Sequence, residues 1–213
     1  SNLTSVTDKD SKVSKYTYTT NNLMSSVQDI DGYKIRTFKG SGYDIACAKA
    51  EAPIFYQINE STGQRVNESR AANFNPSFKD NIYFIYQGHK QNSANEVKAF
   101  LDKKKNYDRE IKSISEISRI IPDIQTLSDF NYFIKVHEEI MSSCLERKRI
   151  KKHFNDFEGE MKSLGAWGGD FFMAATEWDD DKVIEYFRNK GLDVIFKYND
   201  IILNREIEKT LTL

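Results

Sequence analysis

The stretch Asn81-Ile-Tyr-Phe-Ile-Tyr86 is the strongest strand signal in this sequence of 213 residues. Its β-branched and aromatic side chains favour the extended backbone of a sheet. Gly88 follows the run and marks a turn. Shorter apolar runs predict further strands at 54–58, 171–176 and 193–198.

Helical periodicity dominates the middle of the chain. Apolar residues recur every three or four positions over 93–104, 107–121 and 128–148. Thr126 or Ser128 would cap the longest of these helices, because a hydroxyl oxygen accepts from the N–H groups of the first turn. Shorter helices are predicted over 21–31, 45–52, from about 151 to 161, and over 179–190. This order of elements predicts an α+β fold, in which an antiparallel sheet carries a helical layer.

Composition indicates a protein with a hydrophobic core and gives no sign of a nucleic-acid or membrane partner. Hydrophobic residues make up 39% of the chain, with 14 Phe and 11 Tyr, which is enough for a core. The formal net charge of −1 gives no electrostatic reason to expect nucleic acid or an anionic membrane as a partner. No apolar run approaches the roughly 18 residues of a spanning helix. The first residues also lack the pattern of a signal peptide.

The two cysteines and the first residues bear on location and domain organisation. Cys47 and Cys144 have no neighbouring cysteine and no metal-ligand spacing, so we expect reduced thiols in a cytoplasmic protein and no metal site. Residues 1–20 are rich in Ser, Thr, Lys and Asp, and we expect a polar tail or a truncated edge there. Residues 21–213 are expected to form one α+β domain.

Two glycine-bearing strings carry the functional signal. The first string is Lys39-Gly-Ser-Gly-Tyr-Asp-Ile-Ala-Cys-Ala48, and the second string is Lys162-Ser-Leu-Gly-Ala-Trp-Gly-Gly-Asp-Phe-Phe172. Each joins a glycine loop to an apolar run, and such a loop lets backbone N–H groups approach a ligand closely. If the two loops meet in space, they form a site for a phosphorylated or otherwise anionic small molecule.

Each string also has a purely structural interpretation. Asp44 falls where a helix should start, so its carboxylate either caps that helix or accepts and orients the proton of a substrate hydroxyl. The second string is expected to follow a helix and precede a strand, so it also fits a helix end with a tight turn. It lacks the Gly-Lys-Ser/Thr of a Walker loop, and no Gly-x-Gly-x-x-Gly opens a helix as in a Rossmann site.

Taken together, the strings resemble the GHMP kinase superfamily. Gly40-Ser-Gly-Tyr-Asp-Ile-Ala46 is similar to the segment that carries the catalytic aspartate in several members. Lys162-x-x-Gly165-Ala-x-Gly168-Gly169 is similar to the third conserved motif of the superfamily. The literal Gly-Tyr-Asp-Ile-Ala is closer still to the bacterial GYDIA branch, in which a tryptophan such as Trp167 replaces a motif glycine.

The resemblance assigns roles to named residues. Asp44 would be the catalytic aspartate, and Ser93, in a Lys-Gln-x-Ser loop, is a further candidate for contact with the substrate. The role of Asp170 is open. The loops around the substrate and its phosphate would be formed by Gly40, Ser41, Gly42, Gly165, Ala166, Gly168, Gly169 and Asp170. The fold implied is the ferredoxin-like, C-terminal half of a GHMP kinase.

The resemblance also implies an activity and its cofactors. GHMP kinases transfer the γ-phosphoryl group of ATP, with Mg²⁺, to a small molecule, and a mevalonate-pathway metabolite is the first substrate class by analogy with mevalonate and phosphomevalonate kinases. The family's ATP loop, Pro-x-x-x-Gly-Leu-Gly-Ser-Ser-Ala, is expected before Asn21 and is not in this sequence. This chain alone is therefore expected to be inactive, with a small-molecule substrate as its partner and a homodimer as one way to cover exposed apolar surface. The alternative is a non-catalytic ligand-binding or interaction module derived from the same fold.

Two other features receive structural interpretations. His137 lies on the apolar stripe of the helix predicted at 128–148, which favours a core or semi-buried position over a metal ligand. The basic run at 147–152 is interpreted as the solvated end of that helix rather than a nucleic-acid patch.

Overall fold

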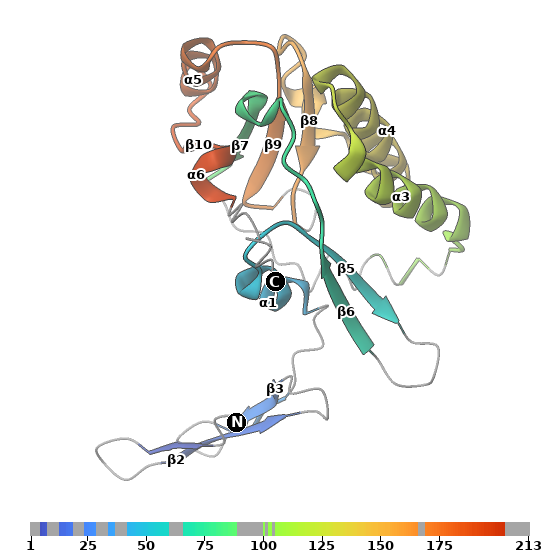
Figure 1. Cartoon of the computed structure of the whole chain (residues 1–213), viewed down its shortest axis with the longest axis vertical. Coiled ribbons are helices and arrows are strands. Elements are labelled where there is room, and N and C mark those ends of the chain that lie inside the picture. The colour runs from blue at the N-terminus through green and yellow to red at the C-terminus, as the bar shows by residue number, and fades with distance from the viewer. Residues whose placement is uncertain are drawn as a thin grey trace, which may run out of the picture. The chain divides into compact units, whose positions relative to one another are not determined.

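The protein is described by a computed structural model, shown in Figure 1. The described residues are 5–7, 13–18, 24–28, 34–36, 42–59, 66–88, 100, 102–103, 105–165 and 169–202. The chain divides into two compact units. The first unit is Ser1–Ala50 with Ile54–Arg70, and the second unit is Glu51–Pro53 with Ala71–Leu213.

The first unit begins with a sheet of four strands in sequence order. These are β1 (Ser5–Thr7), β2 (Val13–Tyr18), β3 (Met24–Gln28) and β4 (Lys34–Arg36), and each neighbouring pair is antiparallel. The helix predicted over 21–31 is therefore wrong. Its apolar spacing rested on three residues, while the Ser-Ser-Val stretch at its centre has low helix propensity, so strand pairing prevails. β2 and β3 also pair across residue 20, where the sequence suggested a boundary.

The rest of the first unit is helix α1 (Tyr43–Lys49) and a two-stranded sheet of β5 (Ile54–Asn59) and β6 (Val66–Ala71). The rings of Tyr43 and Tyr56 meet edge to face with centroids 5.6 Å apart, which joins α1 to β5. The prediction of a helix and then a strand is confirmed here, but β6 was not predicted. Its residues 68–71 are all exposed, so no apolar alternation marked it.

The second unit is built on an antiparallel sheet with the strand order β10-β7-β9-β8. The strands are β7 (Ile82–Tyr86), β8 (Glu160–Ser163), β9 (Phe171–Ala175) and β10 (Ile195–Lys197). The helices are α3 (Asp108–Ile120), α4 (Leu127–Leu145), α5 (Asp180–Arg188) and α6 (Tyr198–Ile201). Short 3₁₀ turns lie at Lys79–Asn81, Ile121–Asp123 and Ile150–His153.

The connectivity of this sheet confirms the predicted fold class. In chain order the elements run β7, α3 and α4, β8, β9, α5, β10, so that β9 lies between β7 and β8 and β7 lies between β9 and β10. This split βαβ arrangement, used twice, gives the strand order of ferredoxin-like sheets. The fold is α+β with antiparallel sheets, as the sequence predicted.

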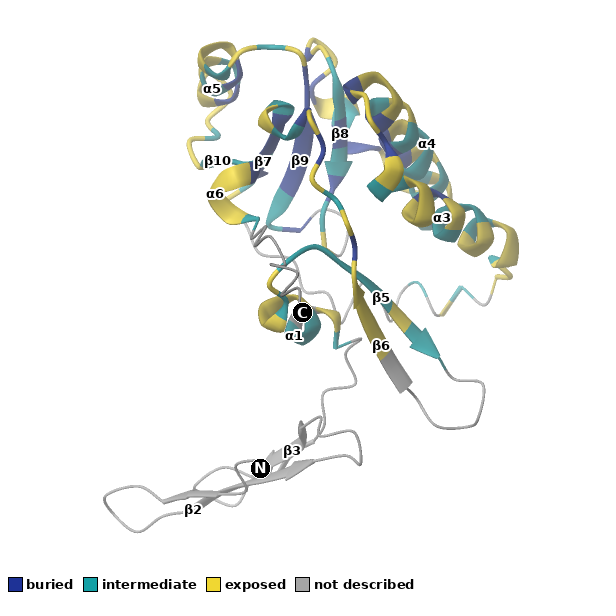
Figure 2. Cartoon of the chain, viewed as in Figure 1, coloured by how far each residue is buried: buried dark blue, intermediate teal, exposed yellow. Residues whose placement is uncertain are grey.

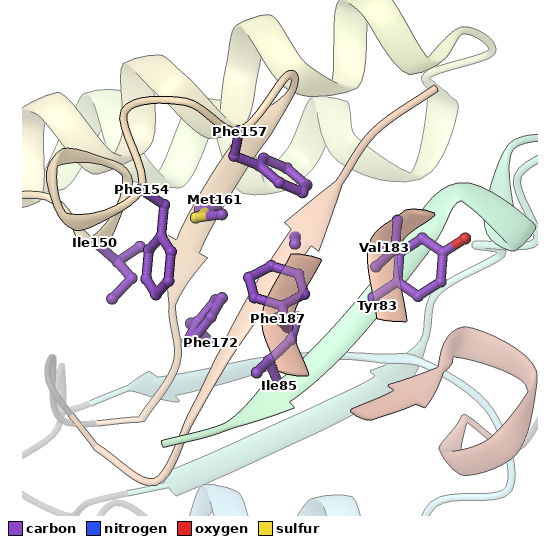
Figure 3. Packing of buried hydrophobic residues seen from close by; sticks show 10 residues of the cluster. Tyr83, Ile85, Ile150, Phe154, Phe157, Met161, Phe172, Val183 and Phe187 are labelled. Carbon is purple, nitrogen blue, oxygen red and sulfur yellow. The ribbon is translucent and has the colours of Figure 1, made fainter. Parts of the chain in front are cut away.

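Both faces of this sheet are packed, so more than one helical layer is present. The cluster on one face includes Val183 and Phe187 of α5, and the cluster on the other includes Phe130 and Ile134 of α4. The first cluster, drawn in Figure 3, consists of Tyr83, Ile85, Ile150, Phe154, Phe157, Met161, Phe172, Ala174, Val183 and Phe187. The second consists of Phe78, Ile82, Ile124, Leu127, Phe130, Ile134, Met173, Ala175 and Tyr198. Figure 2 shows that β7 and β9 are deeply buried between them.

Several helix predictions can be compared directly with the structure. Those over 107–121, 128–148 and 179–190 are confirmed by α3, α4 and α5. Thr126 caps α4, where its hydroxyl oxygen accepts from the N–H of Asp129. The helix predicted over 93–104 lies mostly outside the described residues.

The helix predicted from about 151 to 161 is wrong. Its residues form one 3₁₀ turn, an irregular segment and then strand β8. Phe154, Phe157 and Met161 have helical spacing, but all three enter the first cluster from this irregular path. Gly159 explains the break, because its φ is 136° and a Cβ there would lie 2.2 Å from the carbonyl oxygen of Ala175.

Within the described residues, no helix combines the length and the apolar content that crossing a membrane requires.

Packing in the first cluster predicts how much single substitutions change the free energy of unfolding. Phe187 is fully buried and its ring contacts those of Phe154, Phe157 and Phe172. Phe187→Ala should lower the free energy of unfolding by about 3–5 kcal/mol. Ile111→Ala, at a helix position that is 61% exposed, should change it by less than about 0.5 kcal/mol. Urea denaturation measures both, and equal effects would contradict the assigned core.

Candidate functional site

The first string leads directly into α1. Gly42 is the N-cap residue, in the left-handed conformation with φ 78°, and its carbonyl accepts from the N–H of Ala46 at 3.0 Å. Asp44 is the second residue of the helix, in its first turn, where a carboxylate is favoured by the helix dipole. The N-cap is therefore Gly42 and not Asp44. The side chain of Asp44 lies outside the described residues, as do Gly40 and Ser41.

The second string forms the connection of a β-hairpin. It leaves β8 at Ser163 and enters β9 at Phe171, and the N–H of Leu164 donates to the carbonyl of Phe171 at 3.2 Å. The prediction that this string follows a helix, or ends one, is wrong because a strand precedes it. Gly165 has φ 63°, and a Cβ there would meet nothing within 4 Å. Ala166, Trp167 and Gly168 lie outside the described residues.

Gln87 holds the far end of the second string. Its side-chain Nε2 donates to the carbonyl of Gly169 at 2.7 Å, and its backbone N–H donates to the carbonyl of Asp170 at 2.7 Å. Gly169 is buried, so the first of these bonds satisfies a carbonyl that water does not reach freely. Sequence reasoning missed Gln87, although it follows the strongest strand signal and precedes Gly88. The candidate Ser93 lies outside the described residues.

Buried polar groups flank the near end of the second string. Glu138 of α4 is fully buried, and the hydroxyl of Ser163 donates to its Oε2 at 3.5 Å. Burial lowers the pKa of the Lys162 ammonium, and the charge of Glu138 opposes that change. We call Glu138, Lys162 and Ser163 the buried polar cluster. Sequence reasoning did not single out Glu138.

His137 adjoins this cluster. Burial, and secondly the charge of Lys162, lower the pKa of His137 to about 4, so it is neutral at pH 7. His137 is half-buried, which agrees with the core or semi-buried position predicted for it.

The basic run at 147–152 is only partly a solvated helix end. Arg147, Lys148 and Lys152 are exposed, as expected. Arg149 is buried and pairs with Glu139 of α4 and with Glu160 of β8. One arginine of the run therefore ties α4 to the edge of the sheet.

The two strings lie in different compact units: Asp44 belongs to the first unit, and the second string belongs to the second unit. Among the described residues, no group of three or more His, Cys, Asp or Glu is arranged to hold a metal ion. The second string offers a hairpin loop with fixed ends, a left-handed glycine and a cation at its start.

Comparison with known proteins adds one similar structure. No family model matches the chain, and no curated protein matches it. A crystal structure of a Lin0012 protein from Listeria innocua is similar with a TM-score of 0.48 and 14% sequence identity. The match covers 76% of this chain and 49% of the other, so this chain spans about half the length of that protein.

His137 predicts a specific pH dependence of stability. In the unfolded chain it binds a proton near its ordinary pKa of 6.5, and in the folded chain only near 4. Between these values the unfolded state holds more protons, so this group lowers the free energy of unfolding as the pH falls from 6.5 to 4, by about 3 kcal/mol at most. His137→Gln should lose correspondingly less stability than the natural chain over this range. Urea denaturation at several pH values measures this, with His153→Gln, at an exposed histidine, as the control that keeps the natural slope.

The buried polar cluster predicts strong coupling between two side chains. Glu138→Leu should cost about 3–5 kcal/mol, because it leaves the Lys162 ammonium without its opposite charge. Adding Lys162→Met should restore most of that loss, because no uncompensated charge then remains. Additive losses in the double variant would show that the two side chains do not interact.

Proposed function

We propose that this chain is the substrate-side part of a GHMP-type small-molecule kinase. The reaction is transfer of the γ-phosphoryl group of ATP to a hydroxyl or phosphate group, with a mevalonate-pathway metabolite as the first candidate. The observation that supports it most is the second string, a glycine loop between two antiparallel strands with a left-handed Gly165 at its start. Backbone N–H groups in such a loop can surround a phosphate without side chains in the way.

The first string supplies the proposed catalytic group. Gly42 allows α1 to begin immediately after a glycine turn, which places Asp44 in the first helical turn. In the proposed reaction its carboxylate accepts or orients the proton of the substrate hydroxyl. Phosphoryl transfer otherwise depends on positioning and on stabilisation of charge around the phosphates.

ATP and Mg²⁺ are the proposed cofactors, on the strength of the family resemblance. The Gly-Leu-Gly-Ser-Ser loop typical of the family is not among these 213 residues. The chain alone is therefore proposed to bind the acceptor substrate more tightly than Mg-ATP, and to be inactive by itself. Free Cys47 and Cys144 fit the proposed cytoplasmic location. Homodimer formation stays a prediction, which light scattering tests.

The second candidate is a non-catalytic binding module on the same scaffold. Calorimetric titration of the chain with Mg-ATP, mevalonate and phosphomevalonate separates the candidates. Micromolar binding of Mg-ATP would exclude the module, and no binding of any of the three would exclude the kinase.

Asp44 provides the sharper test. In the natural gene product, assayed for ATP-dependent phosphorylation of mevalonate and phosphomevalonate, Asp44→Asn should lower kcat by roughly 100-fold or more. The matched control is Asp181→Asn, because Asp181 is exposed and is likewise the second residue of its helix, α5. Unchanged turnover in Asp44→Asn would mean that the carboxylate only stabilises the first turn of α1.

Substitution of Gly165 tests the proposed role of the second string through the binding of a phosphorylated substrate. Gly165→Ala and Gly191→Ala both place a Cβ in left-handed backbone with open space around it, so their costs to stability should be similar. Only Gly165→Ala should weaken binding of the phosphorylated substrate, because only Gly165 belongs to the proposed phosphate loop. Equal binding by the two variants would remove the second string from the site.

A further inference from the structure

One face of α3 is left exposed by the described part of the chain. Ile117 is the buried residue of this helix, which packs against α4. Successive side chains are about 100° apart around a helix, so the residues opposite Ile117 follow from the sequence. They are Asp108, Ile111, Lys112, Ser115, Glu116 and Arg119, and all but Ser115 are exposed (Figure 2). Ile111, at 61%, is among the most exposed large apolar side chains of the described residues.

The charged side chains of this face have no ion-pair partner within the described residues. None of Lys112, Glu116 and Arg119 takes part in an ion pair there. The carboxylate of Asp108 accepts from the neutral side-chain amide of Asn106 at 3.0 Å. Asp108 and Arg119 stand at opposite ends of α3, about 16 Å apart along its axis, so they cannot meet within one helix. The face therefore presents opposite charges at its two ends.

The order of these charges fits a second, antiparallel copy of α3. Around a two-fold axis close to residues 113 and 114, Asp108 of each copy would lie beside Arg119 of the other copy. Lys112 of each copy would lie beside Glu116 of the other in the same way. Every one of these contacts joins opposite charges, so the face is complementary to itself.

Ile111 supplies an apolar contact for the same pairing. It would lie over Ser115 and Ser118 of the second copy, which are the small residues at its margin of the face. Their hydroxyls already donate within their own helix, to the carbonyls of Ile111 at 2.7 Å and of Ile114 at 2.9 Å. The two serines therefore leave room for an apolar side chain without burying an unpaired hydroxyl donor.

We propose that α3 is the contact surface of a homodimer, in which two antiparallel copies of the helix pair Asp108 with Arg119 around Ile111. A second copy fits this face better than nucleic acid or an anionic membrane, because its acidic and basic side chains balance. The contact is small and its charges are exposed, so the dimer is weak, with a Kd in the micromolar range or above it. This inference is independent of the proposed function, because it requires neither ATP nor a substrate.

Two charge-reversed variants test the pairing. Asp108→Arg brings two arginines together at each end of its own dimer, and Arg119→Asp brings two aspartates together. Each variant alone should therefore dimerise at least about 10-fold more weakly than the natural chain. An equimolar mixture of the two variants should dimerise again, because each end contact then joins an arginine to an aspartate. Sedimentation velocity of the 213-residue chain over a range of concentrations measures this.

The matched control is Arg188→Asp, because Arg188 is an exposed basic residue in the last turn of α5, as Arg119 is in α3. It should leave the Kd of the dimer unchanged. Circular dichroism shows whether each variant is folded, and Ile111→Lys, at a position exposed in the single chain, replaces one that is not and should also lose the dimer. A natural chain that stays monomeric at every concentration would overturn the inference. So would a mixture that dimerises no better than its components, or an unchanged Kd in Ile111→Lys.

Discussion

The pairing of β7 with β9 is the interaction on which the second unit depends. The two strands run antiparallel in register from Ile82↔Ala175 to Tyr86↔Phe171, and β10 and β8 add to their outer edges. Side chains of β9 alternate between the faces, with Phe172 in one cluster and Met173 in the other. A slip of one residue would exchange these faces, so both clusters together fix the register.

That register also places the second string. The last ladder pair joins Tyr86 to Phe171, so Gln87, the residue after β7, lies beside Gly169 and Asp170. The glycine loop therefore begins and ends beside the last paired residues of β8 and β9. Its second end, at Gly169 and Asp170, is held by Gln87, which follows the central strand β7. Packing of the two clusters fixes the register of β7 and β9, and that register places Gln87 beside Gly169 and Asp170.

The sequence predicted those elements whose signal is local. The dense apolar run of β7 and the long stripe of α4, with its Thr126 cap, were recognised because each pattern is complete within one segment. β3 and β6 were missed because pairing with other strands defines them, and β8 was hidden by helical spacing that Gly159 interrupts. The glycine strings were found by composition. Gln87 was not, because its side chain bonds to Gly169, which lies 82 positions away in the sequence.

Glu138 is a fully buried carboxylate at a position of α4 where the helix pattern favours an apolar residue. Phe130, Ile134 and Glu138 follow one another at four-residue spacing on α4, and all three are buried. A carboxylate at this position costs desolvation energy that a leucine would not, and the nearby charge of Lys162 opposes that cost. Natural sequences tolerate such a break in an apolar stripe most often where a site requires it. The break lies against the first residues of the second string, whose other end is held by Gln87. Both ends of that loop are thus held by polar side chains, as the proposed binding role of the second string requires.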